Sequence, residues 1–283
     1  MPRVALATAA SFPDLDEDGP ELLAALAAEG LEVDLTVWDD PAVNWAAYDL
    51  VVIRTTWDYW ERHEEFLAWT RSVPRLLNSA SVVAWNTDKA YLGRLAEAGI
   101  PVVPTTYLMA LDGWTPPDHA FVVKPTVSAG ARDSAAYPAG DPAAIEHVRS
   151  LLAQGRVAMV QPYLSAVDTE GETAVLVFGG EVSHAARKGP VLTVGGGIDN
   201  TVVSRQLTTP RVPSPEEVAL AERVLSVVRG WGDELLYARV DLLPGPVLIE
   251  LEVTEPSLFL RHAPGSAARF AQAVRRAAEL SRA

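Results

Sequence analysis

Residues 237–253 read YARVDLLPGPVLIELEV, and in this stretch two largely apolar runs flank a Pro-Gly-Pro turn signal. Around the charged residues of each run, apolar and charged side chains alternate, a period of two that is typical of strands with one face in a core. The segment therefore predicts an antiparallel hairpin. If its loop has an even number of residues, Asp241 faces Glu250 and Arg239 faces Glu252.

The length of the loop sets this pairing. We expect a four-residue loop, Pro244–Val247, because a two-residue turn over Gly245 and Pro246 would place proline at a disfavoured turn position. An odd loop length would scramble the pairing. With the even loop, all four charged side chains share one face of the hairpin. The opposite face is then apolar and consists of Ala238, Val240, Leu242, Ile249, Leu251 and Val253.

Three carboxylates on one small face would repel one another, and the single guanidinium does not balance them, so a further cation is needed. A hard divalent ion such as Mg²⁺ takes oxygen ligands and leaves room for phosphate oxygens. The pattern therefore predicts a metal site at Asp241, Glu250 and Glu252. The alternative is an ordinary solvated sheet face with one cross-strand ion pair.

Composition limits the classes of partner. The chain has 283 residues, 49% of them hydrophobic, and a formal net charge of −14. It has no cysteine, so thiol chemistry is excluded, and it shows no clustered basic patch of the kind that binds nucleic acid or anionic lipid. With no long apolar stretch and no secretory signal, we expect a cytoplasmic location. Its three lysines, Lys89, Lys124 and Lys188, stand out among 23 basic residues.

The first part of the chain predicts a parallel α/β sheet. Apolar runs at Arg3–Thr8, Glu32–Val37 and Leu50–Arg54 alternate with helical stretches. In such sheets ligands lie beyond the carboxyl ends of the strands. The loops Ala9–Gly19 and Thr55–Tyr59 occupy those ends, and neither common phosphate-binding glycine motif is present.

The rest of the chain, from about Trp85, predicts α+β structure with antiparallel strand pairs. We expect a helix that starts at Asn86 or Thr87, carries Lys89 in its first turn and stops at Gly99. The remaining expected elements are strands at Phe121–Lys124 and Val157–Gln161, a helix after Asp141, a hairpin around Gly179-Gly180, a helix capped by Ser214 and Glu217, and a last helix at about Ser266–Ser281.

Several of these segments together resemble the ATP-grasp ligases, and glutathione-synthetase-like members in particular. The matching features follow in order: a lysine at an expected helix start (Lys89), FVVKP at 121–125, a small-residue loop after it, VQPYL at 160–164 and ELEVTEP at 250–256. The resemblance implies an N-terminal parallel α/β domain and two α+β lobes that clasp ATP. The implied bounds are 1–84 for the N-terminal domain, 85–165 for the central lid and 166–283 for the lobe with the magnesium site.

The resemblance also implies roles for individual residues. ATP would be bound by Lys89, Lys124, Ser128, Gly130, Gln161, Pro162, Tyr163, Leu164 and Glu172. Arg187, Lys188 and Arg239 would act on the transferring phosphate or on an acyl phosphate, and Asp241, Glu250 and Glu252 match the Mg²⁺ ligands. One position departs from the family, which usually has asparagine where this chain has Glu252.

Four phrases are similar to the O-ureidoserine cyclo-ligases, the cycloserine synthetases: RTTWDY at 54–59, KPTVSAGARD at 124–133, ARKGP at 186–190 and EPSLF at 255–259. This resemblance implies that ATP phosphorylates the carboxylate of O-ureido-D-serine. An internal nitrogen then closes the ring to D-cycloserine, with loss of the carbamoyl group. The alternatives are a ligase for another amino acid or peptide, a small-molecule kinase, or a non-catalytic ATP-binding regulatory protein. Family habit further implies a homodimer.

Plainer interpretations stay open for most of these residues. Lys89 and Lys124 also fit surface or strand lysines, Gln161 a strand end, and the Arg187-Lys188 pair a device against edge aggregation. Trp57-Asp58-Tyr59 fits either a packed turn or a contact with a small substrate. Gly195–Gly197 fits either a flexible connection or a set of N–H donors for an oxyanion.

Overall fold

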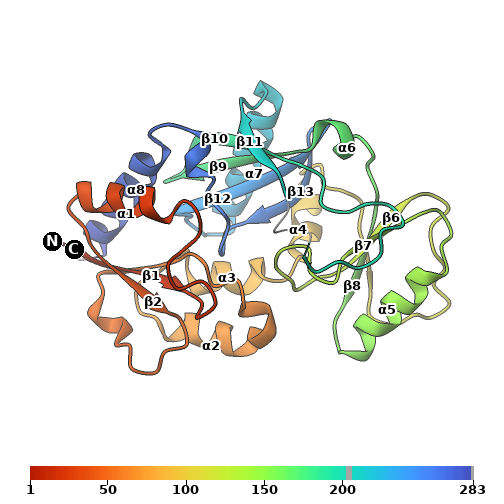
Figure 1. Ribbon diagram of the computed structural model, residues 1–283, viewed down its shortest axis with the longest axis horizontal. Coiled ribbons are helices and arrows are strands. Elements are labelled where there is room, and N and C mark those ends of the chain that lie inside the picture. The colour runs from red at the N-terminus through yellow and green to blue at the C-terminus, as the bar shows by residue number, and fades with distance from the viewer. Residues whose placement is uncertain (202–205, 282–283) are drawn as a thin grey trace.

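The computed structural model describes residues 1–201 and 206–281, and three sheets organise them (Figure 1). The first sheet is parallel, with strand order β2-β1-β3-β4. Its strands are β1 (Arg3–Thr8), β2 (Glu32–Val37), β3 (Leu50–Ile53) and β4 (Leu76–Leu77), and its helices are α1 (Gly19–Ala28) and α2 (His63–Ser72). The parallel α/β unit expected from the alternating pattern is confirmed.

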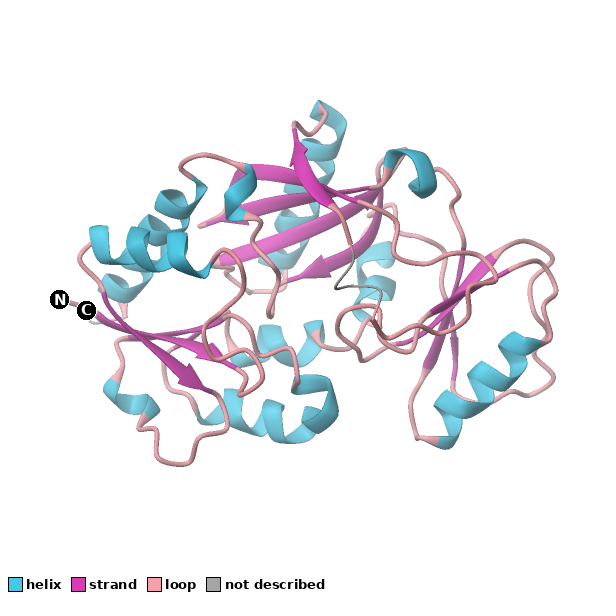
Figure 2. Cartoon of the chain, in the orientation of Figure 1, coloured by secondary structure: helices cyan, strands magenta, loops and turns pink. Residues whose placement is uncertain are grey.

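The second sheet is antiparallel, with order β5-β8-β6-β7. Its elements are β5 (Thr106–Leu108), β6 (Phe121–Pro125), β7 (Ala135–Tyr137) and β8 (Ala158–Pro162), with α5 (Ala143–Ala153) packed on one face. Figure 2 shows this small unit standing apart from the rest of the chain. Its role as a lid stays a prediction.

The third sheet is antiparallel and has the order β11-β10-β9-β12-β13. The strands are β9 (Glu172–Phe178), β10 (Glu181–Lys188), β11 (Thr208–Arg211), β12 (Tyr237–Leu243) and β13 (Val247–Glu252). One face packs on α7 (Pro215–Gly230), whose expected capping box of Ser214 and Glu217 is present. The other face packs at one end on α8 (Ser266–Leu280), which also lies beside α1 and so joins the first and third sheets in one core.

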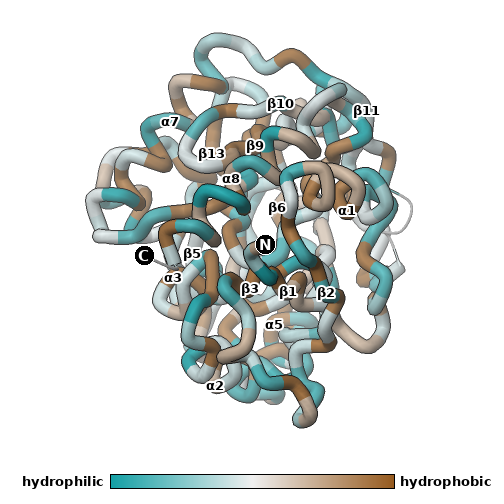
Figure 3. The backbone as a smooth tube through the Cα atoms, turned by 90° about the vertical axis from the view of Figure 1, so that its left-hand side faces the viewer, coloured by the Kyte–Doolittle hydropathy of each residue, from teal (hydrophilic) through white to brown (hydrophobic). Residues whose placement is uncertain are grey.

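Apolar and hydrophilic stretches alternate along the tube in Figure 3, as expected for elements that turn one face to a core. None of the helices in the described ranges is both long and apolar enough to cross a membrane. The three sheets fall within the three expected domain ranges. The bounds themselves stay a prediction: Val82, Leu92 and Ile100 belong to a core cluster made mainly of residues of the third sheet and α7, which Met159 of the lid sheet also joins.

The structure corrects the expected helix around Lys89. Two helices are present, α3 (Ala80–Asn86) and α4 (Tyr91–Glu97), and Lys89 lies in the turn between them. Asn86 does not cap a helix. Its side chain instead donates to Leu251 O at 2.7 Å and accepts from Val253 N at 3.1 Å, which fixes this turn to β13.

The structure also corrects the loop of the β12–β13 hairpin. Val247 belongs to β13, so the loop is Pro244–Pro246 and has an odd number of residues. A β-bulge before Glu250 then shifts the register by one residue, and the expected pairs of Asp241 with Glu250 and Arg239 with Glu252 are present. Ile249 was expected on the apolar face with Leu251; Leu248 takes that place.

Candidate active site

The polar face of β12 centres on Asp241, which is completely buried. Arg239 lies two residues earlier on the same face, and its Nε and NH2 atoms donate to the two carboxylate oxygens of Asp241 at 2.9 and 2.8 Å. Lys188, from β10, donates from Nζ to Asp241 Oδ2 at 2.7 Å. Both oxygens of this carboxylate are therefore bound by cations of the chain.

Three more carboxylates surround this centre, and each has one cation partner. Lys188 Nζ also lies 2.8 Å from Glu172 Oε2, at the start of β9. Arg239 contacts Glu252 Oε1, and Lys89 Nζ lies 3.2 Å from Glu250 Oε1. Strand register brings the first of these together, because Glu172 pairs with Lys188 across β9 and β10.

The charges in this cluster change the pKa of its members in opposite directions. Burial alone would raise the pKa of Asp241, but the adjacent Arg239 and Lys188 lower it to about 2. Burial raises the pKa of Glu252 to about 7, with Arg239 opposing and the neighbouring carboxylates adding to the rise. Asp241 is thus held as an anion, whereas Glu252 needs another cation to ionise fully at neutral pH.

The residues present fit a hard divalent cation in part. Glu250 and Glu252 each use one carboxylate oxygen in an ion pair, and within the described ranges the second oxygen of each has no partner. Such oxygens suit Mg²⁺. No group of three His, Cys, Asp or Glu side chains in the described chain is arranged to hold a metal as it stands, since Asp241 is taken up by Arg239 and Lys188. The three-ligand site stays a prediction.

The expected phosphate-binding residues come together over the same face. Lys89 Nζ donates to Ser128 O at 3.0 Å and so links the cluster to the loop that carries Gly130. Gly130 has φ +64°, a conformation that favours glycine. Burial lowers the pKa of Lys124 on β6, and among the described residues no hydrogen-bond or ion-pair partner reaches its ammonium group.

The expected adenine segment lies at the end of β8. Gln161 donates from its amide to Thr105 Oγ1 at 2.8 Å, and Tyr163 N donates to Ala120 O at 2.8 Å. Pro162 ends β8. Tyr163 and Leu164 then join an apolar cluster with Val103, Val167, Leu243, Val247 and Ile249. This cluster is an apolar surface next to hydrogen-bonding backbone, the combination that a purine ring needs.

Arg187 is placed apart from the other expected catalytic residues. Neighbouring residues on a strand point to opposite faces, so Lys188 enters the carboxylate cluster and Arg187 does not. The guanidinium of Arg187 donates to Glu170 O at 2.7 Å and Thr169 O at 3.1 Å, at the end of α6 (Val167–Glu170). Its role at the phosphate stays a prediction that this geometry does not support.

The turn after β3 carries contacts that sequence reasoning did not find. Asp58 accepts a hydrogen bond from Trp38 Nε1 at 3.0 Å, which makes it part of a packed turn. Its neighbours reach the site: Trp57 Nε1 donates to Glu255 O at 3.0 Å and Tyr59 OH donates to Ser128 O at 3.4 Å. The sequence RTTWDY at 54–59 indicates similarity to the cyclo-ligases, but it does not reveal which distant carbonyls its side chains bind.

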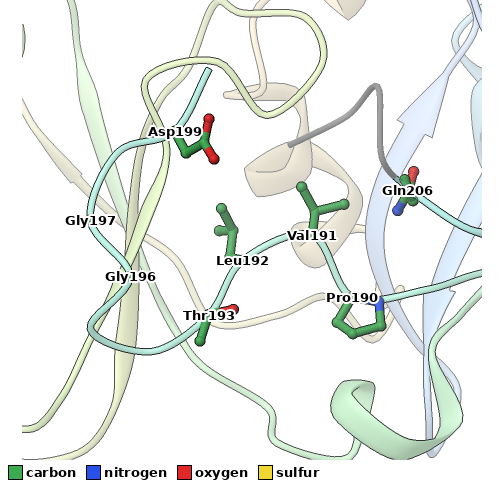
Figure 4. Close-up of a pocket in the computed structure, with 8 residues that line it drawn as sticks. All are labelled: Pro190, Val191, Leu192, Thr193, Gly196, Gly197, Asp199 and Gln206. Atoms are coloured by element: carbon green, nitrogen blue, oxygen red, sulfur yellow. The ribbon is translucent and has the colours of Figure 1, made fainter. Parts of the chain in front are cut away.

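The glycine segment lines a separate hollow. A hollow of about 320 Å³ that opens to the surface lies here, and Figure 4 shows its lining: Pro190, Val191, Leu192, Thr193, Gly196, Gly197, Asp199 and Gln206. None of the expected ATP or metal residues lines it. The N–H groups of Gly195 and Gly196 already donate to Ala136 O and Thr193 O, so two of the three expected oxyanion donors are occupied.

Comparison with known proteins identifies the relatives of this chain. Residues 4–78 match the model of the N-terminal domain of the D-cycloserine synthetase DcsG. The cycloserine biosynthesis protein DcsG of Streptomyces lavendulae is 36% identical over 294 residues, covering 97% of this chain and 98% of the relative. The crystal structure of D-cycloserine synthetase DcsG superposes with a TM-score of 0.87 at 34% identity, covering 99% of both chains.

A more distant structure shares the fold alone. D-alanine–D-alanine ligase from Bacillus anthracis superposes with a TM-score of 0.66 at 13% identity, over 100% of this chain and 99% of the other. The expected mixture of α/β and α+β units in an ATP-grasp arrangement is confirmed. The chain therefore belongs to the D-cycloserine synthetase family of ATP-grasp ligases.

Proposed function

We propose that this protein is an ATP- and Mg²⁺-dependent ligase that closes O-ureido-D-serine to D-cycloserine. The observation that carries the proposal is one sheet face that holds Asp241, Glu250 and Glu252 together with the cations Lys188 and Arg239. Lys89, from the turn before α4, pairs with Glu250 and links this face to the loop that carries Gly130. The substrate follows from the similarity to DcsG, whose name states cycloserine synthesis.

The proposed ATP site spans the lid and the third sheet. Lys89 and Lys124 would bind phosphate oxygens, the backbone at Gln161–Leu164 and the apolar cluster around Leu243 would hold the adenine, and Glu172 the ribose. Related folds support such a site, because the D-alanine ligase from B. anthracis was solved with ATP and the ATP-grasp ligase PsnB with Mg and ADP. Bound as MgATP, the nucleotide would supply the phosphoryl group that activates the substrate carboxylate.

The residues of the chain would act by charge and by exclusion of water. Phosphoryl transfer needs positioned cations more than a nucleophilic side chain, which a chain without cysteine can supply. Arg239 is held rigidly by Asp241, so its guanidinium costs little reorganisation when negative charge develops nearby. The loop at residues 126–134, tied down by Lys89 and Tyr59, would keep water from an activated carboxylate.

The test is ADP release with MgATP and a panel of substrates: O-ureido-D-serine, both serine enantiomers and common dipeptide components. We expect release with O-ureido-D-serine together with a cyclised product, and loss of release in Glu250→Gln. Release with a different amino acid would reject the proposed substrate and keep the ligase. ATP binding without turnover of any substrate would indicate a regulatory nucleotide-binding protein instead.

The remaining expectations belong to the same proposal. They are a small amino-acid-like substrate, no nucleic-acid or membrane partner, a cytoplasmic location and a homodimer. The acidic net charge of −14 supports the absence of a nucleic-acid partner. The homodimer rests on family habit alone and stays a prediction.

A further inference from the structure

The segment directly after β13 is fixed through three consecutive carbonyl groups, those of Glu255–Ser257. Trp57 Nε1 donates to the first carbonyl at 3.0 Å, and Arg54 NH2 donates to the second at 2.7 Å. Arg239 NH1 donates to the third at 3.4 Å. Two residues of the turn after β3 and one residue of the carboxylate cluster therefore hold this segment between them.

Arg54 is held in place by its buried, aromatic surroundings. Its side chain is 2% exposed, and its guanidinium lies over the rings of Tyr237 at 5.6 Å and Phe270 at 5.9 Å. A planar cation stacked on aromatic rings has little freedom to move. The carbonyl that it binds, that of Pro256, is thereby fixed, and so is the backbone of the residue before it.

Glu255 differs from the other acidic residues of the site. The four others each have a cation no more than 3.2 Å from a carboxylate oxygen; they are Glu172, Asp241, Glu250 and Glu252. Across residues 1–201 and 206–281, no donor or cation reaches the carboxylate of Glu255, although its own carbonyl and the next one along the chain are bound. The side chain is partly buried, so its carboxylate is only partly hydrated and has no cation of the chain to balance it.

The surroundings of Glu255 show which space it faces. Burial raises the pKa of its carboxyl group to about 8, and Glu252 and Lys89 are the neighbouring charges that act on it most. In turn, Glu255 is the charge that acts most strongly on Tyr59. The hydrogen bond from Trp57 to its carbonyl places Glu255 between the end of β13 and the turn after β3, where the loops of the N-terminal sheet meet the site.

We propose that Glu255 binds the ammonium group of the amino-acid substrate, and that Trp57 and Arg54 are positioning residues that set its carboxylate. The proposal rests on the function proposed above. An amino acid carries both charges, and the site has a partner for each: Arg239 and Lys124 are cations for the carboxylate, and Glu255 can ionise opposite the ammonium group. A bound ammonium group lowers the pKa of a carboxyl group beside it, which would hold Glu255 as an anion in the complex. The substrate would be oriented by its own two charges.

The experiment compares two substrates in the full-length protein. One is O-ureido-D-serine, and the other is 3-(ureidooxy)propanoate, which lacks the amine and keeps every other group. We expect Glu255→Gln to raise KM for the amino acid by about 10- to 100-fold, the size expected for a lost charged hydrogen bond, with kcat within a few-fold. KM for the analogue should stay within a few-fold.

Two further variants separate positioning from a general loss of structure. Trp57→Phe keeps the ring and removes the donor to Glu255 O, so KM for the amino acid should rise several-fold while KM for the analogue stays unchanged. Glu146→Gln, on the exposed face of α5, is the matched control and should change neither value. Equal losses on both substrates in Glu255→Gln would overturn the proposal.

The outcomes also separate this inference from the proposed function. If the wild-type protein turns over another amino acid instead, the proposed substrate fails. The pair of measurements then uses that acid and its counterpart without the amine, with the same expected contrast for Glu255→Gln. If the wild-type protein binds and turns over the analogue as well as the amino acid, the ammonium group is not recognised and the proposal for Glu255 is wrong.

Discussion

The polar face of the third sheet and the turn after β3 hold their interior charged side chains in different ways. Both place charged side chains in the interior next to the proposed reaction site. On the sheet face, Asp241 is neutralised by Arg239 and Lys188, which come from the same sheet. In the turn, Arg54 and Trp57 bind backbone carbonyls about 200 residues away along the chain.

This difference shows what each region is sensitive to. The sheet face depends on charge balance, because removal of one ion leaves another buried without a partner. The turn depends on hydrogen bonds to carbonyls, which have no net charge and lose less when the donor is removed. Substitutions in the two regions should therefore separate by the size of their effect.

The largest effect is expected from Asp241→Asn. The substitution removes the buried anion that faces Arg239 and Lys188, so we expect a loss of about 3 kcal/mol in the free energy of unfolding. ADP release should fall at least about 100-fold, because both cations lose their orientation. Urea unfolding and a coupled ADP assay measure the two effects. Glu146→Gln serves as the control, and stability equal to that of the wild type would reject charge balance as the organising feature.

The two lysines of the proposed phosphate site should separate stability from binding. Lys89→Met leaves Glu250 without its cation and should cost about 1–2 kcal/mol of stability. Lys124→Met removes a cation without a partner in the described chain, so stability should stay the same or rise. Both should weaken ATP binding about 10- to 100-fold, as measured by calorimetry. Equal stability losses in the two variants would contradict the contrast.

A smaller effect is expected from Arg54→Met in the turn. Methionine keeps the apolar stem over Tyr237 and Phe270 but leaves Pro256 O without its donor. We expect a loss of about 1–2 kcal/mol in the free energy of unfolding, less than for Asp241→Asn. The measurement is urea unfolding of both variants in one buffer. A loss as large as that of Asp241→Asn would remove the distinction between the two regions.

The smallest effect is a pH dependence of stability in the absence of Mg²⁺ and nucleotide. The pKa values of Glu252 and Glu255 are raised to about 7 and about 8, from 4.5 in the unfolded chain. The folded state therefore holds more protons between pH 5 and 8, and this contribution to stability is complete below about pH 4.5 and lost as the pH rises through 7 and 8. Both side chains are partly exposed to water, so solvent screening should make the fall much smaller than these pKa values alone imply. We expect about 1–2 kcal/mol between pH 5.5 and 8, and less in Glu255→Gln. A flat profile would show that other groups neutralise these carboxyls.

The hairpin shows how far pattern reasoning reached. Alternation together with an expected even loop predicted that Arg239, Asp241, Glu250 and Glu252 share one face, and the observed pairs confirm it. The expected loop length was wrong, and a bulge compensated for it. Both loops satisfy the same alternation, and bulge formation depends on the packing of Leu248 and Ile249 against different clusters, which the local sequence does not reveal.

The turn that carries Lys89 shows where pattern reasoning ended. The scarcity of lysine drew attention to this residue, but the helix expected to start before it is two helices with a turn between them. Asn86 was interpreted as a local cap, whereas it binds the backbone of β13 more than 160 residues away. Capping preferences describe neighbours in sequence, and a buried amide is satisfied by whatever lies next to it in space.

Sequence alone determined the alternating charges, the parallel α/β character of the N-terminal unit and the motifs that resemble the ATP-grasp family, because each is a local pattern or an ordered set of such patterns. The three-dimensional structure was needed to show that Lys188 and Arg187 part to opposite faces, that Asp241 has no free oxygen, and that Glu255 lacks a partner. These features depend on which charges meet across distant strands. Coulomb interactions and hydrogen bonds act over a few ångströms in space, whatever the separation along the chain.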